Sequence, residues 1–132
     1  MYTDLVAGEL RYTDDPLGVY VRLVQTVPRL QDGEAEELFR RVEAGDEAAK
    51  RRLIEANLHL VLPIVERHRA SGIHRLELIE KGNDGLIRAV ETFADAPADA
   101  FPAYANNCIE QAVSTAAAAG PIARSFPHLR DS

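Results

Sequence analysis

The sequence predicts an all-α domain, a compact bundle of about five helices. Apolar residues recur at helical spacing along five successive stretches, capping residues precede these stretches, and glycine or proline follows them. A chain of 132 residues can bury one hydrophobic core but not two. We therefore expect a loose lead segment over residues 1–13, one helical domain over 14–119 and a tail over 120–132.

The first helix is expected to begin at Asp14-Asp15-Pro16, because aspartate caps a helix and proline suits its first position. Pro28 ends it. The apolar residues between these points recur at helical spacing and predict its buried side: Leu17, Tyr20, Val21, Val24 and Val27.

The second helix should open at Asp32–Glu37, where acidic residues gather at the end that the helix dipole favours. Its apolar face consists of Leu38, Phe39 and Val42. Gly45 followed by Asp46 predicts the end of this helix and the cap of the next.

The third helix is expected from about Glu47 to about Ser71, with Gly72 closing it. Pro63 lies inside this stretch, lacks a backbone donor and crowds the carbonyl of His59. A kink is therefore expected at Pro63.

The fourth helix should cover roughly Leu76–Phe93. Gly82 and Gly85 inside it cost about 1 kcal/mol each relative to alanine, so close approach to another helix or to a partner is the expected reason for them. Two shorter helices separated by a turn at Gly82-Asn83 fit the spacing equally well.

The fifth helix is expected to begin near Phe101-Pro102, after an acidic loop over residues 94–100, and to break at Gly120-Pro121. Its predicted buried residues are Tyr104, Ala105, Cys108, Ile109, Ala112 and Val113.

Composition excludes several classes of protein. No apolar run approaches the roughly 20 residues that span a bilayer, so no membrane association is expected. The first residues lack the blocks of a signal peptide, and one cysteine, Cys108, excludes an internal disulfide, which fits a reducing cytoplasm. The net charge of −6 means that any nucleic-acid-binding face must be local. The densest basic cluster, Lys50-Arg51-Arg52 with Arg40-Arg41 nearby, is surrounded by acids and is expected to be an ion-paired, solvated face.

No catalytic or metal motif occurs. Glu55 and His59 lie four apart, with His68 and His74 further on, but no spacing typical of a zinc site accompanies them. We expect no enzyme activity, no cofactor and no metal.

Five segments follow one another in a recognisable order: Asp15–Tyr20, Val42–Asp46, Ala49–Leu58, Leu78–Phe93 and Phe101–Val113. Together they resemble the sigma-70 family of bacterial RNA polymerase sigma factors, specifically the central region 2 with the preceding region 1.2. The resemblance implies that the helix Leu78–Phe93 docks on a coiled coil of the clamp, in the largest subunit of core RNA polymerase. It implies the polymerase-binding residues Glu77, Leu78, Glu80, Lys81, Asn83 and Asp84.

This docking segment departs from the family pattern at several positions. Glu77 stands where the family usually has aspartate, Glu80-Lys81 where it has glutamine then glutamate, and Asp84 where it has an aliphatic residue. Lys81 therefore reverses a charge in the middle of the expected docking surface.

The resemblance also implies where promoter DNA would be opened. Positions that contact DNA in the family are matched here by Arg88, Tyr104, Gln111 and Ser114. However, Asn107 and Cys108 replace the family's tryptophan pair, Glu110 and Thr115 replace arginines, and the chain has no tryptophan. Proteins hold single-stranded DNA by stacking its bases on aromatic side chains and by pairing its phosphates with Lys and Arg. Because these side chains are replaced here, promoter binding and melting are expected to be weak or lost.

Three hypotheses remain. The chain acts in transcription initiation or its regulation by docking on the polymerase clamp. Alternatively, it is a degenerate sigma paralogue that serves as a protein-interaction module or decoy for an anti-sigma factor, another sigma domain or a second copy of itself. In the third, a partner chain supplies the family's helix-turn-helix domains, which this sequence is not expected to contain up to Ser132.

Overall fold

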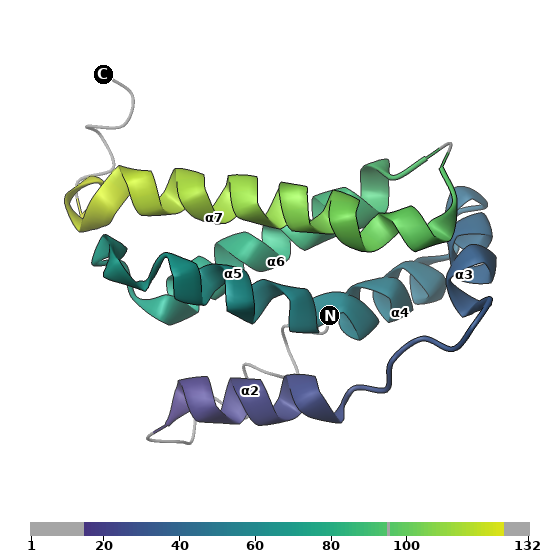
Figure 1. Cartoon of the computed structure of the whole chain (residues 1–132), viewed down its shortest axis with the longest axis horizontal. Helices are drawn as coiled ribbons and strands as arrows, with labels where there is room; N and C mark the ends of the chain where they lie inside the picture. The colour runs from purple at the N-terminus through teal and green to yellow at the C-terminus, as the bar shows by residue number, and fades with distance from the viewer. Residues whose placement is uncertain (1–14, 95, 126–132) are drawn as a thin grey trace.

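All regular secondary structure in the described residues, 15–94 and 96–125 of a computed structural model, is helical, which confirms the predicted all-α class (Figure 1). The predicted lead segment 1–13 lies outside these residues, as does the predicted tail from residue 126 onward. None of the described helices combines the length and the hydropathy that a membrane span requires.

The bundle is built around the pair α6 (Arg75–Thr92) and α7 (Phe101–Ser125), which a loop with the short 3-10 helix η3 (Ala98–Ala100) connects. α5 (Val61–Arg67) packs against both helices. α4 (Glu47–Asn57) contacts α6, and α3 (Glu34–Glu43) packs on α4 at one end of the molecule. In Figure 1, α2 (Pro16–Thr26) lies on the opposite side of α4 and α5 from α7.

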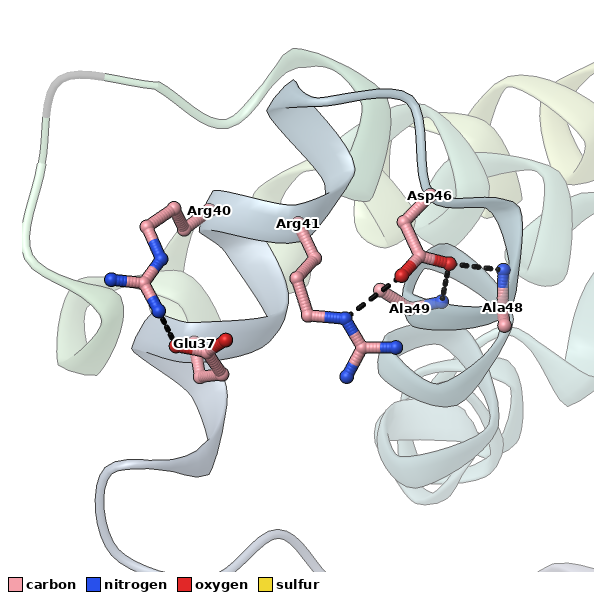
Figure 2. Close-up of polar contacts among 6 residues, drawn as sticks. All are labelled: Glu37, Arg40, Arg41, Asp46, Ala48 and Ala49. Carbon is pink, nitrogen blue, oxygen red and sulfur yellow. Dashed lines mark hydrogen bonds and ion pairs between the residues drawn. The ribbon is translucent and has the colours of Figure 1, made fainter.

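In the N-terminal half, the helices begin and end at the capping and glycine residues that the sequence predicted. Asp15 caps α2 by accepting a hydrogen bond from the Gly18 amide at 3.1 Å. Gly45 adopts a φ of 89°, the left-handed conformation that favours glycine. The Asp46 carboxylate then accepts hydrogen bonds from the amides of Ala48 and Ala49 and caps α4 (Figure 2).

The predicted third helix is interrupted, and the interruption precedes Pro63. α4 ends at Asn57, the 3-10 turn η1 (Leu58–Leu60) follows, and α5 begins at Val61. Pro63 thus lies in the first turn of α5, where its missing amide loses no helical hydrogen bond. At the break, the side-chain amide group of the buried Asn57 donates a hydrogen bond to the Leu53 carbonyl at 2.8 Å. After α5, η2 (Arg69–Ser71) ends at Gly72, as predicted.

α6 is one continuous helix, so the alternative of two helices split at Gly82-Asn83 is wrong. A Cβ added to Gly82 would lie 2.6 Å from a Val61 methyl carbon. At Gly85 it would lie 2.7 Å from the Cys108 carbonyl oxygen and 3.0 Å from the Ile109 Cα. The two glycines therefore allow close approach of α6 to α5 and α7, one of the two reasons that the sequence suggested.

α7 breaks at Gly120, as predicted, where φ is 72° and ψ is 167°. The backbone then forms one further helical stretch to Ser125, so the predicted tail begins with helix. Of the six residues predicted to be buried in this helix, Ala105, Ile109 and Val113 are buried, whereas Tyr104, Cys108 and Ala112 are half-buried. This packing fixes which side of α7 faces outward.

Candidate functional site

Four charged side chains follow one side of α6: Glu77, Glu80, Lys81 and Asp84, which we call the α6 stripe. Their spacing of three and four residues places them on one helix face. Glu80 and Asp84 are exposed, whereas Glu77 and Lys81 are half-buried. In the part of the chain that the structure describes, Glu80, Lys81 and Asp84 form no ion pair with one another or with other side chains. These three residues of the stripe therefore present charge to solvent.

Two predicted docking residues do not lie on this surface. Leu78 is 0% exposed and belongs to the core. Asn83 is 5% exposed, and its Oδ1 accepts a hydrogen bond from the Tyr20 hydroxyl of α2 at 3.4 Å. Burial raises the pKa of Tyr20 to about 12, so the hydroxyl keeps the proton that it donates. Asn83, which the resemblance implies as a polymerase-binding residue, is therefore buried and bonded to α2.

The four candidate DNA contacts divide into exposed and packed residues. Arg88 on α6 and Gln111 on α7 are exposed. The Tyr104 ring packs against Phe93 at a centroid distance of 5.4 Å, and its hydroxyl shares a hydrogen bond with Thr92 Oγ1. That Thr92 oxygen also donates to the Arg88 carbonyl, which links Tyr104 to the α6 backbone.

Ser114 is half-buried, and its hydroxyl donates to the Gln111 carbonyl at 3.3 Å. It lies two to three turns beyond Tyr104 along α7. The hydroxyls of Ser114 and Tyr104 are therefore hydrogen-bonded within the protein. Arg88 and Gln111 are the two candidate DNA contacts that are exposed to solvent.

The most informative contact on α7 joins Glu110 to α5. Its carboxylate accepts from His68 Nε2 at 2.9 Å and from Arg67 at 3.0 Å. The hydrogen bond from His68, and then the one from Arg67, holds the pKa of the Glu110 carboxyl below its usual range. Arg67 was not singled out in the sequence, because a pairing across 43 residues has no local signature. We call Glu110, His68 and Arg67 the α5–α7 cluster, and its carboxylate stands where the resemblance implies an arginine.

Other positions on the outward side of α7 carry no charge. Asn106, Asn107, Gln111 and Thr115 are exposed, and Cys108 is half-buried. This side of α7 therefore offers amides and a hydroxyl to a ligand, with Glu110 as its acidic group between residues 101 and 120.

Four of the five cations of the basic cluster are ion-paired, as predicted, whereas Arg51 is exposed and forms no ion pair within the described residues. Arg40 pairs with Glu37 and Arg41 with Asp46 (Figure 2), while Lys50 pairs with Glu91. Arg52 bonds Glu34 and donates to the carbonyls of Pro28 and Arg29, which fastens the connection between α2 and α3. Apart from Arg51, these cations therefore have internal partners and do not form a free phosphate-binding row.

The histidines considered as metal ligands each contact the protein. His59 Nδ1 lies 3.1 Å from the Ala56 carbonyl oxygen, His68 bonds Glu110, and His74 Nδ1 accepts from the Leu76 amide and caps α6. Across residues 15–94 and 96–120, no three His, Cys, Asp or Glu side chains converge as a metal site.

Comparison with known proteins identifies relatives for most of the chain, although no protein-family model matches it. The chain is 44% identical over 105 residues to the RNA polymerase sigma factor SigA of Bacillus sp. It is 40% identical over 115 residues to the protein of the same name from Clostridium acetobutylicum. These alignments cover 80% and 87% of this chain but only 28% and 30% of the two relatives. Over this matched part, the chain belongs to the sigma-70 family of RNA polymerase sigma factors.

Proposed function

We propose that this domain acts in transcription initiation or its regulation by docking on the clamp coiled coil of core RNA polymerase through the α6 stripe. Its relatives are RNA polymerase sigma factors, and the continuous helix α6 occupies the segment that resembles their polymerase-docking helix. Leu78 and Asn83 support the stripe from behind, because their side chains fix α6 against the core and against α2.

The observation that carries this proposal is the contrast in ion pairing. Arg40, Arg41, Lys50 and Arg52 have carboxylate partners within the described residues. Glu80, Lys81 and Asp84 have none there, although they share one helix face. A charged face without internal partners can exchange water for complementary charges on a partner, which confers orientation and specificity.

Charge reversal in the stripe should weaken docking. We expect Glu80→Lys and Asp84→Lys each to raise the Kd for purified core RNA polymerase by about tenfold or more, since each places a like charge opposite a group that now attracts it. Biolayer interferometry with immobilised domain would give both Kd values.

Asp99→Lys is the matched control, because Asp99 is exposed, lies in η3 and carries the same charge change outside the stripe. Its Kd should stay within about twofold of the unaltered domain. Absence of binding by the unaltered domain would end the proposal, and equal weakening by Asp99→Lys would remove the stripe as the contact.

The α5–α7 cluster favours a second candidate function, a protein-interaction module that has given up DNA. Glu110 places a carboxylate where the family carries a phosphate-binding arginine, and Arg67 and His68 are engaged by it. Asn107 and Cys108 supply no indole for stacking. An anti-sigma factor, another sigma domain or a second copy of the chain would then be the partner.

This candidate predicts that single-stranded promoter DNA is not held. Fluorescence anisotropy with a labelled non-template strand should give a Kd weaker than about 10⁻⁴ M near physiological salt, the weak limit of non-specific DNA binding. Tight binding that weakens steeply with added salt would contradict the loss of DNA contact and would restore promoter melting as the function.

A further inference from the structure

A surface pocket lies at the other end of α6, beyond the α6 stripe. It has a volume of about 260 Å³ and lies between α3 and the segment that connects α6 to α7. Its lining includes Glu36, Phe39, Arg40, Glu43, Phe93 and Ala98. This volume is below the roughly 300 Å³ at which small-molecule sites begin, so the pocket suits a single side chain better than a cofactor.

Two aromatic rings form the apolar wall of the pocket. Phe39 and Phe93 are half-buried, with centroids 5.0 Å apart. Phe101 packs against both rings at 5.1 and 5.3 Å, so the pair is held in place from the core side. Two fixed, partly exposed phenyl rings offer π surface to a planar or cationic group.

Two carboxylates accompany these rings. Glu36, Phe39, Arg40 and Glu43 follow one face of α3 at helical spacing, and all four line the pocket. Glu36 and Glu43 are exposed and form no ion pair within residues 15–94 and 96–120. Their Cα positions are about 10 Å apart along the helix axis. The one cation of the lining, Arg40, pairs with Glu37 outside the pocket (Figure 2).

We propose that this pocket binds an arginine side chain of a partner protein. A guanidinium is planar enough to stack on the phenyl rings and can donate several hydrogen bonds to Glu36 or Glu43. An acidic side chain or a phosphate would meet two unpaired carboxylates, so the charge of the pocket disfavours both. A purely apolar side chain would use the rings and leave the carboxylates without a role.

A titration of the full chain with short peptides tests this site. The capped tripeptide Gly-Arg-Gly should shift the amide NMR signals of Phe39, Phe93 and Ala98, with a Kd on the order of 1 mM. The same peptide with citrulline, a neutral isostere of arginine, should bind about tenfold more weakly, because it keeps the shape and loses the charge.

Variants of exposed residues separate binding from folding. Glu36→Gln with Glu43→Gln should weaken the Gly-Arg-Gly peptide by about tenfold, whereas Glu47→Gln, a neutralisation outside the pocket, should leave it unchanged. Arg40→Gln should strengthen binding, because it removes the competing cation. Equal shifts from the citrulline peptide would overturn the proposal. So would stronger shifts at these residues from the capped tripeptide Gly-Glu-Gly or from a thymidine oligonucleotide.

Discussion

Replacing Leu78 by alanine should lower the free energy of unfolding by about 2–5 kcal/mol, the range found when a buried leucine leaves a cavity. Leu78 is 0% exposed and belongs to the hydrophobic cluster that joins α6 to the rest of the bundle. Urea denaturation followed by circular dichroism would measure the change, provided that the transition stays two-state.

Glu80→Ala is the control, since Glu80 is exposed two residues further along α6. It should change stability by no more than about 0.5 kcal/mol. This pair of variants distinguishes a core residue from a docking residue. If Leu78→Ala kept full stability and lost only polymerase binding, Leu78 would contact the polymerase directly, as the resemblance implies, and would not be a core residue.

The second large effect is expected at Gly85, where alanine should destabilise the domain by about 1–3 kcal/mol despite its better helix propensity. Propensity alone would favour alanine by about 1 kcal/mol. The added Cβ would meet the backbone of Cys108 and Ile109 at 2.7 and 3.0 Å, and α7 must move to make room. Thermal and urea denaturation would both report this loss.

Gly82→Ala provides the comparison, because its closest obstacle is a side chain. There the new Cβ would lie 2.6 Å from a Val61 methyl carbon, which a second substitution can remove. Val61→Ala should therefore recover part of the stability lost in Gly82→Ala and none of that lost in Gly85→Ala. A Gly85→Ala variant more stable than the unaltered chain would contradict the close packing of α6 on α7.

Signals that reside in a few neighbouring residues were predictable from the sequence. Asp15-Pro16 and Gly45-Asp46 were placed correctly because caps and glycine stops act within one turn. The buried side of α7 was predictable for the same reason, since Ala105, Ile109 and Val113 repeat at helical spacing.

Features that depend on distant segments were not predictable. Nothing in the sequence of α6 indicates that Asn83 is buried, because its hydrogen-bond partner, Tyr20, lies 63 residues earlier. The break before Pro63 depends on how Asn57 and Leu58 are buried between helices. The spacing of apolar residues also left open whether Gly82 marks a turn or a close contact between helices. The side chains of Val61 and Ile109 lie next to Gly82, which shows that it allows a close contact.

The α5–α7 cluster also affects how fast partners arrive. Arg67 and His68 lie beside the Glu110 carboxylate, so the charges largely cancel at short range and little field extends into solvent. Long-range attraction to a polyanion accelerates its association by orders of magnitude at low ionic strength. With that attraction cancelled on this side and a net charge of −6, nucleic acid would reach α7 by undirected diffusion. A carboxylate at position 110, paired with Arg67 and His68, thus provides no electrostatic steering of nucleic acid toward α7.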